Sequence, residues 1–297
     1  MGIKPSLVKP FAKRAAKSIQ KWSSQPLKAQ EKVFSDLLSV LKNTAFGKDH
    51  KLDKVNSYEA FKEHIAINDY ENLRPYIDRI IAGENNVLWK GRPKYFAKTS
   101  GTTSGVKYIP LTKESIPNHF GTARNAMFNF AAKANKFDFF DGNMIFLSGS
   151  PTLTKTGGIH TGRLSGIVNH MVPSWLSSSQ LPSFETNCIE EWEDKLEAIV
   201  DETMGKDLRL ISGIPPWVQM YYERLLERSG KKHIKDIFPN YSVFAYGGVN
   251  FEPYRQILEE LVGQRLQSVE TYPASEGFIG FQDNVENDGL LLNVNSG

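Results

Sequence analysis

The sequence predicts an α/β fold in which layered, parallel-rich sheets are flanked by helices. With 297 residues, of which 40% are hydrophobic and 23% charged, the chain is long enough for one large domain or two lobes. Short apolar segments such as 143–147 and 242–246 alternate with amphipathic helical segments. This alternation favours parallel strands that are joined by helices.

The first element expected is a basic amphipathic helix over residues 1–25, ahead of a body formed by residues 26–297. Seven lysine and arginine residues occur before the first acidic residue, Glu31. Apolar side chains recur at helical spacing, at Leu7, Phe11, Ala15, Ile19 and Trp22. We expect this face to pack on the body and the lysines to stay in water. Contact with a membrane surface and a transit peptide are the alternatives.

Periodicity and turn residues define the later elements. Helices are predicted over residues 31–43, 57–65, 72–82, 190–204, 216–228 and 252–261. Strands are predicted over residues 95–97, 108–110, 143–147, 208–211, 242–246 and 265–269. Thr112 is expected to cap a helix that begins at Lys113. Residues 289–297 read as one strand of a hairpin whose partner is missing.

A loop rich in hydroxyl groups and glycine joins the strands at 95–97 and 108–110. Residues 98–107 read KTSGTTSGVK, with five hydroxyls at Thr99, Ser100, Thr102, Thr103 and Ser104. Glycines let backbone N–H groups converge on an anion, hydroxyls add donors, and lysine adds charge. The spacing of Gly101, Gly105 and Lys107 is not that of a Walker loop. The sequence predicts a phosphate-binding loop, with an ordinary surface turn as the alternative.

Two later segments could hold the rest of a nucleotide. Gly247, Gly248 and Val249 follow a buried strand, where the backbone can approach a flat ligand. Residues 270–280, ETYPASEGFIG, follow the strand predicted at 265–269. Their tyrosine ring, small hydroxyl and carboxylate could stack on a purine, contact a phosphate and hold Mg²⁺. A capped strand end is the plain alternative.

Taken in this order, the loop, the glycine pair and the Tyr-x-x-Ser-Glu motif resemble the acyl-adenylate-forming superfamily, which includes luciferases and acyl-CoA ligases. Residues 69–84, 213–218 and 238–248 narrow the resemblance to the auxin-responsive acyl-acid amido synthetases, and it is best to bacterial members. The resemblance runs from about residue 25 to the end of the chain.

The resemblance implies a two-step ligase that uses ATP and Mg²⁺. A carboxylic acid would be activated as acyl-AMP, and an amine, usually that of an amino acid, would accept the acyl group. The chain would be the large N-terminal body of such an enzyme. Because the family's Arg-x-Gly-Asp-like hinge and small mobile C-terminal domain do not follow, we expect an incomplete and poorly active portion.

The resemblance also implies residue roles. The ATP-binding residues would be Thr99, Ser100, Gly101, Thr102, Thr103, Ser104, Gly105, Gly247, Gly248, Val249, Thr271, Tyr272 and Ser275. Lys107 would neutralise charge on the leaving pyrophosphate, and Glu276 would reach Mg²⁺; these two are the catalytic candidates. A solvated lysine is the alternative for Lys107. The first step needs no general base, because the attacking carboxylate is already ionised at neutral pH.

The sequence says less about which carboxylic acid and which acyl acceptor the protein would use. Arg124 and Arg163 are candidates for binding a substrate carboxylate, and a surface arginine is the alternative for each. Five phenylalanines between residues 128 and 140 suit an aryl acid or form a core. A ligase with a thiol acceptor such as coenzyme A, and a non-catalytic nucleotide- or membrane-binding remnant, remain alternative functions.

Composition argues against several other classes of protein. A net charge of +3 is too small to imply a nucleic-acid partner, and the single Cys188 cannot form an internal disulfide. The six histidines lack zinc-ligand spacing, and no apolar run approaches the roughly 20 residues of a transmembrane helix. We therefore expect a cytoplasmic protein whose partners are small molecules.

Overall fold

The computed structural model describes residues 3–100, 105–172, 174–287 and 289–296. Its larger sheet has the strand order β11-β10-β9-β8-β7-β3-β6. Five neighbouring strands are parallel: β6 (Gln180–Leu181), β3 (Asn143–Phe146), β7 (Leu208–Ser212), β8 (Val243–Gly247) and β9 (Ser268–Pro273). Two antiparallel strands, β10 (Phe278–Phe281) and β11 (Leu291–Leu292), extend the sheet at one edge. The predicted α/β class with parallel-rich sheets is confirmed.

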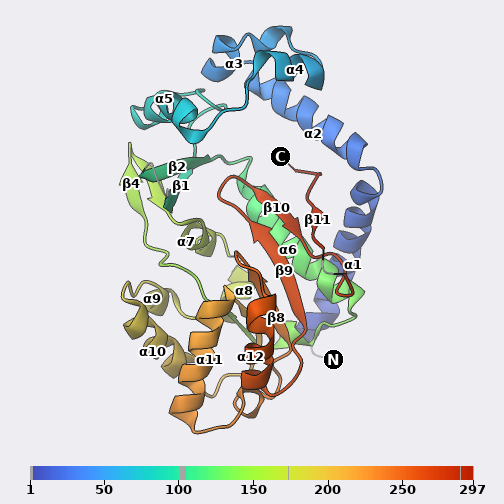
Figure 1. Cartoon of the computed structure of the whole chain (residues 1–297), viewed down its shortest axis with the longest axis vertical. Coiled ribbons are helices and arrows are strands. Elements are labelled where there is room, and N and C mark those ends of the chain that lie inside the picture. The colour runs from blue at the N-terminus through green and yellow to red at the C-terminus, as the bar shows by residue number, and fades with distance from the viewer. Residues whose placement is uncertain (1–2, 101–104, 173, 288, 297) are drawn as a thin grey trace.

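Helices cover both faces of this sheet (Figure 1). Alternate side chains of one strand point to opposite faces, so Ile145 and Met144 of β3 enter different cores. One core contains α10 (Trp192–Thr203), α11 (Pro215–Ser229) and α12 (Glu252–Val262). The other contains α6 (Ile116–Lys133), α1 (Ile3–Ser23) and the 3-10 turn η2 (Asp138–Asp141).

A second, smaller sheet has the order β2-β1-β5-β4. Its strands are β1 (Tyr95–Ser100), β2 (Val106–Leu111), β4 (Thr154–Thr156) and β5 (Ile159–Gly162). Figure 1 shows it at the end of the molecule that also carries α2 (Pro26–Leu41), α3 (Ala45–Asp49), α4 (Tyr58–His64) and α5 (Tyr70–Ile81). The short elements are η1 (Leu52–Lys54), α7 (Leu164–Asn169), α8 (Ser174–Ser177), α9 (Phe184–Asn187) and η3 (Ile234–Asp236).

Three predictions about the ends and the pairing of elements are corrected by the structure, each for an identifiable reason. Strand β9 extends to Pro273 because Thr271 and Tyr272 pair with β10. Helix α6 begins at Ile116 because Thr112 and Ser115 exchange side-chain hydrogen bonds of 2.9 and 3.0 Å and form a separate turn. The hairpin strand near the end of the chain has its partner, since β11 pairs with β10.

The predicted packing face of the first helix is also wrong at two positions. Leu7 and Phe11 are each 64% exposed, whereas Val8, Ala12 and Ile19 are buried. Val8 and Ala12 share a core cluster with side chains of α6, and Ala12 is completely buried. The small side chain of Ala12 lets the two helices approach closely, which turns Leu7 and Phe11 outward. Among the helices that the structure describes, none combines the length and apolar character that crossing a bilayer requires.

Candidate functional site

The predicted phosphate loop connects β1 and β2, as expected. Its residues 101–104 and the side chain of Ser100 lie outside the described part of the chain. On its flanks, Thr99 pairs with Lys107 across the hairpin, and Gly105 has a φ of +81° that favours glycine. The Lys107 ammonium lies 5.6 Å from the centre of the Tyr70 ring. Lys107 is therefore half-buried against α5 rather than fully solvated.

The glycine pair and the start of the second motif meet at the carboxyl ends of β8 and β9. Gly247 is the strand partner of Thr271, and a Cβ at position 247 would lie only 2.2 Å from the Thr271 carbonyl oxygen. The Thr271 hydroxyl donates a 3.0 Å hydrogen bond to the carbonyl oxygen of Tyr246. Gly248 follows with a φ of +84°, in the left-handed region. Only glycine fits position 247 at this spacing of the strands.

The rest of the second motif forms a short turn between β9 and β10. The Ala274 N–H donates to the Gly277 carbonyl oxygen at 2.9 Å and closes the turn. Tyr272 is 52% exposed, Ser275 is half-buried, and Glu276 is exposed. The tyrosine ring and the carboxylate are both open to a ligand.

A magnesium site built only from protein groups is not found within the described residues, since no group of three or more His, Cys, Asp or Glu side chains converges there. Mg²⁺ bound to nucleotides commonly uses one or two carboxylates, with phosphate and water oxygens completing its octahedron. An exposed carboxylate such as Glu276 fits that use.

Two residues that sequence reasoning missed lie under this turn. Asn118 in the first turn of α6 accepts a 2.8 Å hydrogen bond from the Phe278 N–H and donates one of 2.6 Å to the Ser296 hydroxyl. The neighbouring His119 is only 5% exposed, and neither ring nitrogen has a partner among the residues described. Burial lowers the pKa of His119, and the Glu276 carboxylate partly opposes that shift. His119 therefore presents a buried imidazole, without a ring-nitrogen partner among the described residues, near enough to the predicted magnesium ligand for the Glu276 charge to act on it.

The two candidate arginines occupy different places. Arg124 is exposed, and its side chain donates a 3.2 Å hydrogen bond to Asn125, the next residue. Arg163 precedes α7, and its Cδ lies 3.1 Å from where a Cβ of Gly149 would be. Gly149 follows β3, so Arg163 lies near the carboxyl end of that strand. The hydrogen bonds and ion pairs of the described residues connect neither arginine to the 274–277 turn.

The phenylalanine series belongs to a core. Phe130, Phe137, Phe139 and Phe140 are buried in the cluster beneath α1 and α6, and Phe128 packs against it. The core interpretation of these residues is confirmed, and they are not the lining of an aryl-acid pocket.

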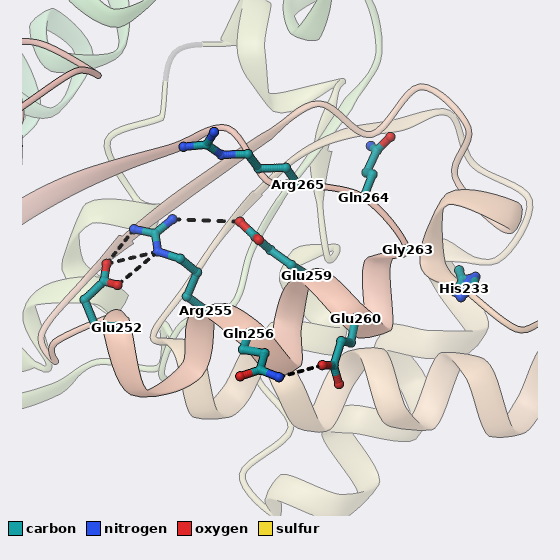
Figure 2. A pocket seen from close by; sticks show the side chains of 9 residues that line it. All are labelled: His233, Glu252, Arg255, Gln256, Glu259, Glu260, Gly263, Gln264 and Arg265. Atoms are coloured by element: carbon teal, nitrogen blue, oxygen red, sulfur yellow. Dashed lines mark hydrogen bonds and ion pairs between the residues drawn. The ribbon is translucent and has the colours of Figure 1, made fainter.

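A concavity of about 690 Å³ lies over α12, apart from all of the predicted site residues (Figure 2). Figure 2 shows Arg255 paired with Glu252, at 3.0 Å, and Gln256 with Glu260, at 2.9 Å, whereas no interaction is drawn for Arg265. Because none of the predicted site residues lines the concavity, we assign it no part in the nucleotide site.

The family model described as "GH3 family N-terminal domain" matches residues 15–187 and 160–267. Indole-3-acetic acid-amido synthetase GH3.2 of Arabidopsis thaliana is 32% identical over 105 residues, which are 35% of this chain and 19% of that protein. Jasmonoyl--L-amino acid synthetase JAR4 of Nicotiana attenuata is 27% identical over 138 residues, 46% of this chain and 23% of that protein.

Among solved structures, the AtGH3.15 acyl acid amido synthetase in complex with 2,4-DB superposes with a TM-score of 0.79 at 15% identity. The match covers 96% of this chain and 60% of that one, so the two share a fold over nearly all of the present sequence. The chain spans less than two thirds of the length of these relatives.

Proposed function

The chain belongs to the GH3 family, and from this premise we propose that it is the ATP- and acid-binding part of an acid–amine ligase. An ionised carboxylate attacks the α-phosphorus of ATP, the bond to the β-phosphate oxygen breaks, and pyrophosphate leaves with that electron pair. An amine, that of an amino acid, then attacks the acyl carbon, the bond from that carbon to the phosphate oxygen breaks, AMP leaves with the electron pair, and the nitrogen releases a proton to water. The names of the amido synthetases that the chain resembles support the amine acceptor.

The observation that carries this proposal is the meeting of the glycine pair with the Thr271–Glu276 segment at the carboxyl ends of two neighbouring parallel strands. Ligands of open α/β sheets bind at this edge of the sheet. In the proposed site Gly247, Gly248 and Val249 line the adenine, and the exposed Tyr272 ring stacks on it. Thr271 and Ser275 lie toward the α-phosphate.

Glu276 is proposed as the protein ligand of Mg²⁺, which supplies charge neutralisation on the phosphates. His119 is buried, the Glu276 charge acts on it, and its ring nitrogens have no partner within the part of the chain that the structure describes; we propose that it completes the site by hydrogen bonding to a bound reactant. A neutral imidazole can donate from one nitrogen and accept at the other, so it can serve an acid without adding a charge.

The hairpin loop is proposed to hold the β- and γ-phosphates through Thr99, Ser100, Gly101, Thr102, Thr103, Ser104 and Gly105. Lys107, opposite Thr99, would stabilise the charge that develops on pyrophosphate. Arg163 is the better placed of the two arginines for a substrate carboxylate, since it lies at the carboxyl end of β3, whereas the Arg124 side chain contacts its own neighbour.

We also assign residues 26–297 to the nucleotide- and acyl-binding body and residues 1–25 to its basic amphipathic N-terminal helix. The acyl-adenylate-forming superfamily and its bacterial amido synthetases remain the family context that we propose for the chain. The expected chemistry is independent of whether the acid is aryl or aliphatic.

The test is exchange of labelled pyrophosphate into ATP, measured with a panel of carboxylic acids. Exchange that requires an acid and is lost in Glu276→Gln supports acyl-AMP formation. AMP release that then depends on an amino acid supports the ligase, whereas release that depends only on coenzyme A would assign a thiol acceptor. Because the chain spans part of its relatives' length, Mg·ATP binding is measured in parallel, so that a missing second step is not mistaken for a missing site.

A further inference from the structure

The outward face of α1 combines cations with large apolar side chains. Leu7, Phe11, Arg14 and Lys21 follow one another at spacings of four, three and seven residues, which places them on one side of a helix. Lys13 and Lys17 occupy the adjoining stripe. All six side chains are exposed, and Leu7 and Phe11 each keep 64% of their surface in water. We call these six residues the outer face of α1.

The charge on this face is uncompensated. Within the described residues, none of Lys13, Arg14, Lys17 and Lys21 takes part in an ion pair, although many arginines and lysines elsewhere do. The first turn of α1 contains no acidic residue, and the sequence has none before Glu31. The face therefore attracts an anionic partner.

The helix is fixed to the body by its opposite side. Val8, Ala12 and Ile19 are buried, and Lys9 lies 5.6 Å from the centre of the Phe137 ring. Figure 1 shows α1 running along one edge of the molecule beside α6. The outer face is thus presented by the folded protein and does not need the helix to detach.

We propose that the outer face of α1 binds the surface of an anionic phospholipid bilayer. Lysine and arginine side chains attract acidic headgroups, and apolar side chains between them enter the boundary of the acyl chains. A nucleic acid would use the cations but would leave Leu7 and Phe11 in water. The combination of exposed Leu and Phe with unpaired cations favours the bilayer over a polyanion.

With only two apolar side chains available, attachment is peripheral, reversible and dependent on both features. Single weak anchors hold a protein at a membrane only together with a second, electrostatic one. The face would bring the protein to acidic membranes without a membrane-spanning helix. This inference does not rest on the proposed ligase function.

The experiment is co-sedimentation of the purified chain with phosphatidylcholine vesicles that contain or lack about a third phosphatidylserine. We expect binding to the acidic vesicles, weak binding to the neutral ones, and a decrease as salt is raised. Lys13→Glu/Lys17→Glu is expected to weaken binding about tenfold or more, because two charges change sign at the surface. The matched control Lys231→Glu/Lys232→Glu reverses two exposed lysines after α11 and should bind as the parent does.

A second pair of variants tests how much the apolar side chains contribute to vesicle binding. Leu7→Ser/Phe11→Ser should weaken binding about tenfold, whereas Tyr58→Ser/Ile67→Ser, which removes exposed apolar side chains elsewhere, should not. Circular dichroism confirms that each variant is folded. The proposal is overturned if neutral and acidic vesicles bind equally, if control and test pairs behave alike, or if single-stranded RNA binds more tightly than acidic vesicles and ignores Leu7→Ser/Phe11→Ser.

Discussion

The ammonium group of Lys195 on α10 donates a 3.0 Å hydrogen bond to the main-chain carbonyl oxygen of Ser148, two residues beyond β3. It also donates to the carbonyl oxygen of Asn187 at 2.8 Å. In the sheet, β3 has β6 on one side and β7 on the other, and the chain leaves β3 and β7 in opposite directions. Crevices for ligands form at such a switch point. Lys195 therefore fixes the backbone just beyond the carboxyl end of β3, next to this switch point.

We predict that Lys195 makes folding stability rise with pH above about 8. Burial lowers the pKa of Lys195 from 10.5 to about 8, and Cys188 opposes part of that shift. Between pH 8 and 10.5 the unfolded chain then binds the extra proton, so the free energy of unfolding increases, by at most about 1.4 kcal/mol per pH unit. Denaturant unfolding of Lys195→Met should lack this increase. Lys206→Met, at an exposed position after the same helix, should keep it; equal slopes in the two variants would refute the assignment.

Gly247→Ala is predicted to damage both the fold and the nucleotide site. The added Cβ would lie 2.2 Å from the Thr271 carbonyl oxygen, so β8 and β9 must separate there. Overpacking of this kind costs about 1–3 kcal/mol, and Mg·ATP affinity should fall with it. Gly121→Ala in α6 has open space and should instead gain about 0.5–1 kcal/mol. If Gly247→Ala unfolds like the parent, the close approach of the two strands is wrong.

His119→Phe is predicted to reduce activity without reducing folding stability. Removing a buried imidazole with unpaired nitrogens leaves no lost hydrogen bond, so the free energy of unfolding should stay the same or increase. Acid-dependent pyrophosphate exchange should nevertheless decrease, because the group proposed to meet a reactant is gone. His170→Phe provides the contrast: its ring nitrogen is 2.8 Å from the Pro151 carbonyl oxygen, and its loss should destabilise the fold. A large stability loss in His119→Phe would show a purely structural role.

Asn118→Ala is predicted to loosen the turn that carries Glu276. The variant leaves the buried Phe278 N–H without its acceptor, at a cost of about 1–3 kcal/mol. Mg·ATP should bind more weakly at temperatures where the variant is still folded, since the carboxylate is no longer held in place. Asn125→Ala, in the same helix, should change neither quantity. Unaltered nucleotide binding in a destabilised Asn118→Ala would confine this residue to folding.

Local sequence pattern was sufficient for most of the large sheet. Buried runs predicted β3, β7 and β8. The glycines at the end of β8 were expected to let the backbone approach a flat ligand; the structure shows Gly247 close to the Thr271 carbonyl oxygen of β9, and the approach of a ligand stays a prediction. Periodicity also located α10, α11 and α12 within two residues at each end. The positions of these strands and helices depend on their own residues, so one sequence is enough to predict them.

The features that the sequence did not predict depend on packing between residues far apart in the chain. Leu7 and Phe11 have the helical spacing of a buried face, yet the closeness of Ala12 to α6 turns that face away. The extension of β9 comes from pairing with β10, and the exposure of Glu276 beside His119 depends on residues more than 150 positions apart. A lone histidine on a helix gives no local signal of such a neighbour.

A calorimetric titration of Mg·ATP into the chain decides whether the proposed nucleotide site exists. The account predicts saturable binding that weakens in Glu276→Gln and in Thr102→Ala/Thr103→Ala, and that persists in Glu286→Gln, which removes an exposed carboxylate elsewhere. Loss in both test variants would unite the hairpin loop and the 274–277 turn in one nucleotide site. Absence of binding, or equal binding by all four proteins, would contradict the account.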